Sequence, residues 1–502
     1  MRTLGVPGRS AAVLLAGTIG VLVPLVPALA QTSSDGGYWA TPPPAVQGAQ
    51  PDDGGGHSGI PYTKTKDCVS RDLNNNIVLR EKPWGQQYLQ IEEAQQLAIA
   101  KTGSAGGGQK VAVIDTGVTQ HPYFKYPIVS GGDYVDPADG GLLDCDGHGT
   151  EVAGIIAANT PASIGFKGVA PDAQIVSIRQ SSQNYELKSQ TSSAQAPPAS
   201  SSANPPAGGG GETSGQQTGD DTGSREQGQG AGNTHTLAQA VVRAANLHVG
   251  VINMSVDNCR TADGTINSGE RELQAAIHYA VSQNVVVVAA AGNTSDTCKQ
   301  NNQPDPNKPQ SIVSPPWFSD DVLSVAAIDD TGSVASFSMN GPWVSVAAPG
   351  TKITSLDPSK GTDQLANQVV ENDKQQDIQG TSFAAPYVAG LVALVRAQFP
   401  TLDARQVMQR IEATAQHPGA PGGHDNYIGY GVVNPVAALT SVVPQEDGIP
   451  VAQAKQPALG LPPAANKNWT PIIVALAGTG GGLLVLLITL FVMHTIRRNR
   501  TT

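Results

Sequence analysis

Short, continuous runs of valine, isoleucine and alanine alternate with helical patterns through most of the chain, and this alternation limits its fold more than any other feature. The apolar runs lie at residues 111–114, 173–180, 250–256, 285–293, 321–329 and 343–350. The helical patterns lie at residues 83–100, 148–159, 235–249, 269–284 and 381–400. Strands that are apolar on both faces and alternate with helices predict an α/β fold, with a parallel sheet sandwiched by helices.

The composition excludes some functions and limits the size of the core. The 502 residues suffice for one large domain with additional segments. The chain has 41 acidic and 30 basic residues, and its formal net charge of -11 argues against nucleic acid as a partner, because phosphates require a basic surface. With 57 glycines, 37 prolines and only 5% aromatic residues, part of the chain should be linker.

The N-terminus has the pattern of an export signal. Arginines precede an apolar stretch at residues 11–26, which is followed by an A-x-A cleavage pattern that ends at Ala30. An uncleaved anchor is the alternative, but the apolar stretch is short. We therefore expect a signal peptide at residues 1–30, followed by a Pro- and Gly-rich N-terminal extension at 31–83.

The C-terminus has the pattern of a membrane anchor. Residues 471–493 carry no charge, and at about 1.5 Å per residue they exceed a hydrocarbon core of roughly 30 Å. Arginines follow directly, and positively charged flanks remain in the cytoplasm. The sequence predicts a Pro/Ala-rich linker at 441–470, one transmembrane helix at 471–493 and a cytoplasmic basic tail at 494–502. The domain before the linker would then lie on the extracytoplasmic side of the cell membrane.

Residues 180–233 interrupt the α/β pattern. They are mostly Ser, Gln, Gly, Pro, Ala and Thr, with Leu187 as their only leucine. Such a segment cannot bury enough apolar area to offset its conformational entropy, which predicts a disordered surface insertion. A linker between two domains is the alternative. Because strand and helix patterns continue on both sides, we expect one domain at residues 84–440.

Four cysteines occur in a chain that the signal directs to an oxidising compartment, where disulfides persist. Four cysteines allow three pairings. Proximity in the sequence favours a bond between Cys259 and Cys298, which leaves Cys68 to pair with Cys145. The sequence contains no C-x-x-C motif or histidine cluster that would favour a metal site instead.

Four polar residues lie where predicted strands end or predicted helices begin. Asp115 and Asn293 follow apolar runs, and His148 and Ser382 each open a helical pattern. The carboxyl ends of parallel strands meet at one edge of a sheet, where functional groups gather. Taken singly, each residue suits an ordinary cap or loop position.

Together these four residues form a chemically complete set. A serine hydroxyl is a poor nucleophile without a base, which a histidine supplies, while an aspartate orients the imidazole. The Ser382 N–H at a helix N-terminus and the Asn293 amide could stabilise an oxyanion. Their order along the chain is Asp, His, Ser, as in subtilisin.

The segments VAVIDTGV, GHGTEVAG, INMSV, VVVVAAAGN and GTSFAAPYVAG resemble, in this order, the sequence blocks of the subtilisin-like serine proteases. The resemblance spans about Trp84–Leu439. It implies a subtilisin-like fold with Asp115, His148 and Ser382 as catalytic triad and Asn293 as oxyanion donor, without a cofactor. It also implies substrate-binding walls that contain Ser255, Val256, Ala290, Ala291 and Gly292.

The sequence departs from that family at several positions near these residues. Glu151 replaces a histidine that many subtilases carry, and Phe383 and Tyr387 replace a common Met and His. Asp257 and Asn258 replace glycines that often line the primary pocket. No catalytic group is lost, but the expected substrate specificity changes. No metal ligand is assigned: many subtilases bind calcium, but no compact acidic loop in this sequence requires it, and calcium binding stays open.

The whole layout resembles the mycosins, the membrane-anchored subtilases of mycobacterial type VII secretion systems. The resemblance implies secreted protein substrates, association with subunits of the secretion membrane complex, and an N-terminal extension that wraps the protease domain. The two disulfide pairings fit this family as well. An alternative interpretation is a structural cap subunit of the secretion complex, in which protease activity is dispensable.

Overall fold

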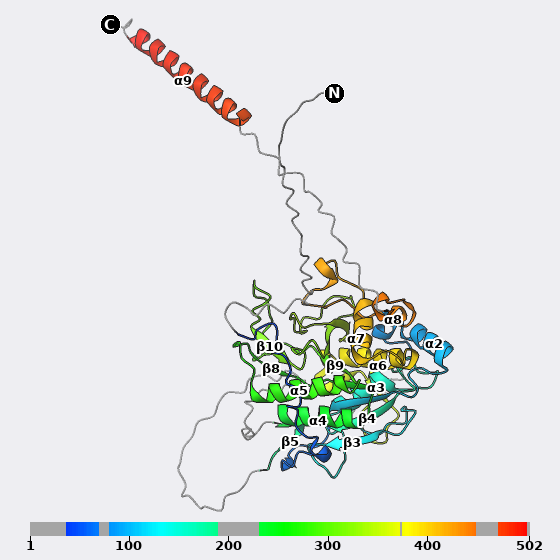
Figure 1. The fold of residues 1–502 in the computed structure, drawn as a ribbon. Helices are drawn as coiled ribbons and strands as arrows, with labels where there is room; N and C mark the ends of the chain where they lie inside the picture. Colours follow the sequence, from blue (N-terminus) through cyan, green and yellow to red (C-terminus); the bar gives the residue numbers. More distant parts are fainter. Residues whose placement is uncertain (1–36, 70–79, 189–229, 372–373, 448–469, 499–502) are drawn as a thin grey trace, which may run out of the picture. The chain divides into compact units, whose positions relative to one another are not determined.

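The computed structural model describes residues 37–69, 80–188, 230–371, 374–447 and 470–498 (Figure 1). The predicted signal peptide at 1–30 lies outside these residues, as does most of the predicted linker at 441–470. The chain divides into two units, one ending at Glu446 and one beginning at Asp447, and each is described here by itself.

A seven-stranded sheet in which every neighbouring pair is parallel forms the centre of the first unit. Its strands in spatial order are β12 (Val346–Pro349), β11 (Leu323–Ile328), β9 (Val286–Ala290), β7 (Val251–Met254), β2 (Lys110–Asp115), β4 (Gln174–Arg179) and β3 (Val129–Asp133). Every residue of β7, β9 and β11 is buried, as expected for strands covered on both faces.

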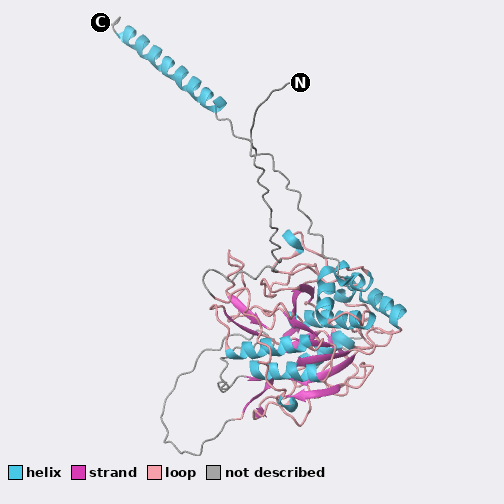
Figure 2. Cartoon of the chain, in the orientation of Figure 1, coloured by secondary structure: helices cyan, strands magenta, loops and turns pink. Residues whose placement is uncertain are grey.

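Helices cover the two faces of this sheet, as Figure 2 shows. Helices α4 (Thr234–Asn246) and α5 (Ser268–Ser282) lie side by side and pack on one face (Figure 1). Helices α3 (His148–Ala157) and α6 (Thr381–Gln398) pack together on the other. The predicted α/β sandwich is therefore confirmed. The remaining helices of the first unit are α1 (Trp84–Tyr88), α2 (Ile91–Thr102), α7 (Ala404–Ala413), α8 (Pro435–Thr440) and the 3-10 turns η1 (Gly54–Gly56), η2 (Pro421–Gly423) and η3 (Pro444–Asp447).

Side-chain caps define where several helices begin. Asn233 begins α4 and Asn267 begins α5, each with a reciprocal capping box to the third helical residue. Asp403 and Gln406 form the same arrangement at α7. Such caps satisfy N–H groups that have no partner within the helix.

The pattern at residues 83–100 predicts one amphipathic helix, but the structure divides it into α1 and α2. Gln90 adopts a left-handed backbone conformation with φ 53° between them. The periodicity identified the helical character, but nothing in it marks the single residue where the axis turns.

Short antiparallel pairs supplement the main sheet, and the sequence did not predict them. They are β1 (Tyr62–Lys64) with β5 (Ser182–Leu187), β5 with β6 (Gly230–Ala231), β8 (Asn258–Thr261) with β10 (Ser311–Ser314), β13 (Ser355–Leu356) with β14 (Leu365–Ala366), and β15 (Gln368–Glu371) with β16 (Lys374–Asp377).

The two ends of the segment 180–233, for which the composition predicts disorder, are part of the fold. They form strands, β5 and β6, which pair with each other, and β5 also pairs with the N-terminal β1. Residues 189–229 lie outside the described part of the chain. Backbone hydrogen bonding within a three-stranded sheet orders segments whose composition alone predicts disorder.

The N-terminal extension packs against the α/β domain at several separate points. The indole N–H of Trp317 donates to the carbonyl of Trp39 at 2.9 Å. The Tyr134 hydroxyl donates to the carbonyl of Asp53 at 2.7 Å. These contacts keep the extension on the domain surface, as the family resemblance implied.

The second unit contains the helix α9 (Thr470–Arg498). Its segment Ile473–Arg498 has a mean hydropathy of 2.3 and is long and apolar enough to cross a membrane. The helix therefore extends beyond the predicted span at 471–493 and includes arginines that the sequence assigned to the tail.

Candidate active site

A direct hydrogen bond joins Asp115 and His148. Asp115 is the last residue of β2, and His148 is the first of α3. The imidazole Nδ1 lies 2.7 Å from Asp115 Oδ1, which also accepts the N–H of Thr116 at 2.7 Å. The Asp115 side chain is fully buried, whereas that of His148 is 18% exposed. The carboxylate therefore orients the ring, and Nε2 is left as the reactive nitrogen.

His148 lies in a strongly acidic surrounding. Burial of the imidazole disfavours its charged form, but the carboxylates of Asp115, Glu151 and Asp144 outweigh this effect and raise the pKa of His148 to about 9. The buried Nε2 makes no hydrogen bond to any residue within the described ranges. The ring is therefore a strong base with its second nitrogen directed away from Asp115.

Asp144 organises the turn that leads into α3. Its carboxylate accepts the backbone N–H groups of Gly147 at 2.8 Å and Thr150 at 2.7 Å, together with the Thr150 hydroxyl at 2.7 Å. Neither Asp144 nor its neighbour Asp146 is a fully solvated loop charge. Asp144 is buried, and burial raises the pKa of Asp146 to about 6.

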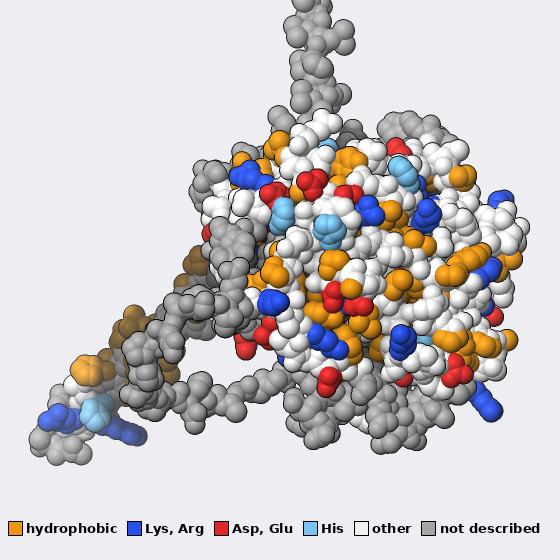
Figure 3. Space-filling model, turned by 90° about the horizontal axis from the view of Figure 1, so that it is seen from below, with side chains coloured by type: hydrophobic (Ala, Val, Ile, Leu, Met, Phe, Trp, Pro, Cys, Tyr) orange, Lys and Arg blue, Asp and Glu red, His pale blue; other side chains and the backbone are white. Residues whose placement is uncertain are grey.

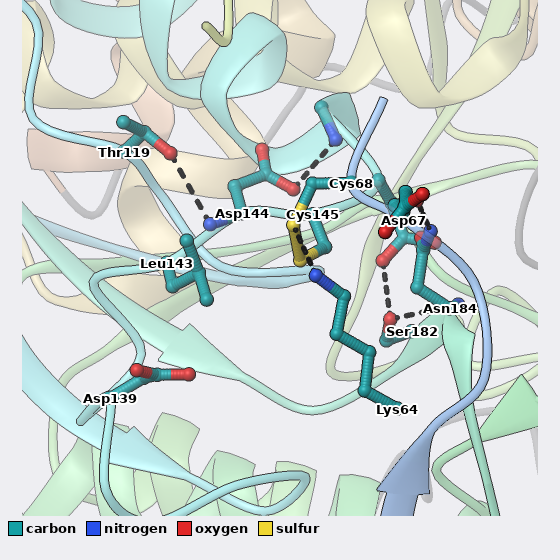
Figure 4. Close-up of a disulfide and its surroundings, with 12 residues drawn as sticks. Lys64, Asp67, Cys68, Thr119, Asp139, Leu143, Asp144, Cys145, Ser182 and Asn184 are labelled. Atoms are coloured by element: carbon teal, nitrogen blue, oxygen red, sulfur yellow. Dashed lines mark hydrogen bonds between the residues drawn. A yellow bond between two sulfur atoms is a disulfide. The ribbon is translucent and has the colours of Figure 1, made fainter. Parts of the chain in front are cut away.

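A disulfide between Cys68 and Cys145 attaches the N-terminal extension to this same turn (Figure 4). The side chain of Asp146 accepts the hydroxyl of Ser182, the first residue of β5, at 2.5 Å. The N-terminal extension and β5 thus contact residues that lie three and two positions before His148.

Ser382 lies at the start of α6 and is 1% exposed. The ring of the next residue, Phe383, lies 5.0 Å from the His148 ring, measured between centroids. Within the described residues, no hydrogen bond links Ser382 and His148, and the ring contact adds to the packing of α6 against α3. Phe383, in place of the more common Met, therefore supports the histidine.

Gly380 is required where the chain enters α6. Its φ of 148° is unfavourable for other residues. A Cβ at this position would lie 3.2 Å from Ser382 Oγ and 3.8 Å from Asn293 Nδ2. Both polar atoms therefore border the small space that the glycine leaves open.

The orientation of the Asn293 side chain follows from its contacts with Thr381. Asn293 Oδ1 accepts the Thr381 N–H at 3.0 Å and the Thr381 hydroxyl at 3.1 Å. The amide oxygen is thereby held by α6, and Nδ2 is the end that faces Gly380 and Ser382. Thr381 was not predicted to contribute, although its place directly before Ser382 was a signal that could have identified it.

Ser255 supports the first turn of α6 from the neighbouring strand. Pro386 lies within α6 and has no N–H to donate to the carbonyl four residues earlier, that of Ser382. The Ser255 hydroxyl donates to this carbonyl at 2.8 Å. Asn253 in turn donates to Ser255 Oγ at 2.9 Å.

The predicted substrate-binding residues lie at the ends of two adjacent strands. β7 and β9 are hydrogen-bonded neighbours, so the segments that follow them lie side by side. They carry Ser255, Val256, Ala290, Ala291 and Gly292, all of them buried. The Gly292 N–H donates to the Thr381 hydroxyl at 3.2 Å, and a second disulfide, Cys259–Cys298, joins the two segments further on.

Among the residues that the structure describes, no group of three or more His, Cys, Asp or Glu side chains is arranged to hold a metal ion.

Comparison with known proteins places this site in a family. Residues 106–431 match the subtilase family, Peptidase S8. Mycosin-1 of Mycolicibacterium smegmatis is 39% identical over 451 residues, which cover 87% of this chain and 90% of that protein. Mycosin-1 of Mycobacterium tuberculosis is 42% identical over 414 residues, which cover 80% and 83% of the two chains.

Solved structures give the same relationship. The crystal structure of MycP1 from Mycobacterium smegmatis matches with a TM-score of 0.67 and 38% identity, covering 80% of this chain and 96% of that chain. A chain in the structure of an intact ESX-5 inner membrane complex matches with a TM-score of 0.65 and 36% identity, covering 89% and 98%. The chain therefore belongs to the subtilase family of serine proteases and, within it, to the mycosins.

Proposed function

We propose that the protein is a membrane-anchored serine endopeptidase of a type VII secretion system that cleaves secreted proteins through Asp115, His148 and Ser382. The observation that carries the proposal is the 2.7 Å contact between His148 Nδ1 and Asp115, which leaves Nε2 as the nitrogen that could accept the serine proton. The His148 ring also lies 5.0 Å from the ring of Phe383, the residue after Ser382. His148 is the first residue of α3 and Ser382 is the second residue of α6, and these two helices pack together.

The reaction would proceed through an acyl-enzyme. Ser382 Oγ attacks the scissile carbonyl as its proton passes to His148 Nε2, and a C–O bond forms. The Asn293 amide and the Ser382 N–H stabilise the oxyanion. The C–N bond then breaks as His148 gives the proton to the departing amine. Water, activated by His148, hydrolyses the ester and restores the serine.

The surface and the C-terminal helix suit this location and class of substrate. α9 is long and apolar enough to anchor the protein in the cell membrane, and the arginines at its end favour a cytoplasmic C-terminus with the protease domain on the extracytoplasmic side. On the face drawn in Figure 3, acidic and basic side chains are interspersed with apolar ones and do not form a basic patch. Proteins, and not nucleic acids, are the partners that such a surface favours.

A fluorophosphonate probe tests the proposal on the full-length protein in detergent. The wild type should be labelled, Ser382→Ala should not, and the exposed-serine variant Ser282→Ala should be labelled normally. Absence of labelling from folded wild-type protein, or labelling of Ser382→Ala, would overturn the assignment of the nucleophile.

A second function, stabilisation of the secretion membrane complex, is favoured by a separate observation. The match to a chain in the structure of an ESX-5 inner membrane complex covers 98% of that chain and 89% of this one. The similarity therefore includes more than the protease domain. We therefore expect Ser382→Ala to support secretion while substrate processing stops. Loss of both activities in a normally folded variant would mean that the two roles are not separable.

A further inference from the structure

A buried carboxylate beside the proposed catalytic groups has no part in the mechanism above. Asp257 is 8% exposed and follows β7. Its side chain makes no hydrogen bond or ion pair with any residue in the described part of the chain. Burial alone raises the pKa of Asp257 to about 7. An acid that is buried without a protein partner is costly, which points to a ligand that supplies the missing partner.

Asp257 belongs to the segment that follows β7, and its carboxylate lies against the segment that follows β9. A Cβ at Gly292 would lie 3.2 Å from Asp257 Oδ2, so the carboxylate faces the backbone that leads into Asn293. Two residues before Asp257, the Ser255 hydroxyl binds the carbonyl of Ser382 at 2.8 Å. The Asp257 carboxylate thus faces Gly292, the residue before the proposed oxyanion donor Asn293, and Asp257 itself follows Ser255, which supports Ser382, by two residues.

The residues that the structure places opposite the carboxylate are small or apolar. Ala290, Ala291 and Gly292 on the adjacent segment are small, and Val313 is apolar and lies 2.9 Å from the same Gly292 position. A substrate side chain that binds between the segments after β7 and β9 would therefore contact small or apolar groups along its length and the Asp257 carboxylate at its end. A long aliphatic stem with a cationic end matches that arrangement.

Given the proposed protease function, we propose that Asp257 determines primary specificity by binding the lysine or arginine side chain that precedes the scissile bond. The ammonium or guanidinium group would supply the charge partner that the carboxylate lacks. Asp257 is in this role a specificity residue, and it takes no part in proton transfer.

Quenched peptides that differ only in the residue before the scissile bond test this on the full-length protein. Arginine, lysine, alanine and norleucine are compared, because norleucine keeps an aliphatic stem without the charge. We expect kcat/KM for arginine and lysine to exceed that for norleucine by roughly tenfold or more, the scale of one charge-assisted hydrogen bond. Asp257→Asn should bring the ratio of kcat/KM for the arginine peptide to that for the norleucine peptide close to one.

Matched variants separate the possible outcomes. Asp296→Asn makes the same change of charge at a nearby exposed position and should keep the preference. Asp257→Gly provides a second replacement if Asp257→Asn misfolds, with fluorophosphonate labelling of Ser382 as the test of folding. Equal cleavage of arginine and norleucine peptides, or an unchanged preference in both Asp257 variants, would overturn the proposal.

A binding measurement keeps this proposal distinct from the protease function itself. In the Ser382→Ala background, the arginine peptide should bind more tightly than the norleucine peptide by fluorescence anisotropy, and adding Asp257→Asn should equalise the two. If the wild type is neither labelled nor active but this binding preference is present, the catalytic assignment fails and the specificity assignment stands. If the wild type is labelled but neither peptide is preferred in binding, the specificity assignment fails and the catalytic assignment stands.

Discussion

The Ser255 hydroxyl donates a 2.8 Å hydrogen bond to the carbonyl of Ser382, the carbonyl that Pro386 leaves without its helical donor. Two residues more than a hundred positions apart are thereby joined at the start of α6. The proline removes a bond from the helix, and the neighbouring strand end replaces it.

Replacement of Ser255 should therefore affect both stability and turnover. Ser255→Ala leaves the Ser382 carbonyl buried without a donor, which should lower the free energy of unfolding by about 1–3 kcal/mol. Because the same bond positions the serine, kcat should fall more than KM rises. Urea unfolding and steady-state kinetics measure the two effects. Ser255→Thr keeps a hydroxyl and should retain much of the stability and of kcat. Normal kinetics in Ser255→Ala would contradict the positioning role.

Removal of the Asn293 amide should slow the chemical step. Asn293→Ala should reduce kcat by roughly 10²–10³-fold with little change in KM, because the oxyanion exists only in and near the transition state. Thr381→Val, which removes the hydroxyl bound to Asn293 Oδ1, should give a smaller decrease in the same direction. A kcat that is unchanged in Asn293→Ala would mean that other donors bind the oxyanion.

The pH dependence of activity should follow the protonation of His148. Protonated imidazole cannot accept the serine proton, so kcat/KM should rise with pH through the pKa of His148, which nearby carboxylates raise to about 9. Glu151→Gln removes one of these negative charges and should move the acidic limb to lower pH by roughly half a unit or more. The exposed Glu93→Gln should leave the profile in place. A shift to higher pH in Glu151→Gln would contradict this account of the histidine's surroundings.

The stability of the protein should decrease as pH rises through the titration of Glu412. Burial raises the pKa of Glu412 to about 7, above its value of 4.5 in an unfolded chain. The folded state therefore holds a proton that the unfolded state has already lost, and stability falls between these two pH values. Glu412→Gln should raise the free energy of unfolding at pH 8 by roughly 1–3 kcal/mol and flatten this dependence. Urea unfolding of the wild type and the variant at pH 5 and pH 8 measures this effect. An equal difference in free energy of unfolding between the two proteins at both pH values would contradict a role for Glu412 titration.

The sequence predicted the strand and helix pattern well because the central strands are buried on both faces. Continuous apolar runs identified β2, β7 and β9, so Asp115 and Asn293 could be placed at strand ends before any contact was known. β3 was missed because its sequence VSGGD carries two glycines and no apolar run. Its place at the edge of the sheet comes from pairing with β4.

The N-terminal extension shows the opposite case. Its composition predicts a linker, and no local signal predicts that Trp39 and Asp53 contact Trp317 and Tyr134. These contacts join residues far apart in the sequence, and only the folded domain brings the partners together.

By itself the sequence determined the α/β class, the candidate groups Asp115, His148, Asn293 and Ser382, and the two apolar terminal segments, because periodicity, motif order and hydropathy are local properties. The tertiary structure decided how those groups are supported and what lies beside them. It placed the Asp144 turn beneath His148, the Thr381 contacts that orient Asn293, the Ser255 bond that replaces the one lost at Pro386, and the buried Asp257 carboxylate beside Gly292. Each of these depends on which buried polar atoms find a partner across the fold, and that pairing is settled only when separate strand ends and helix starts meet at one edge of the sheet.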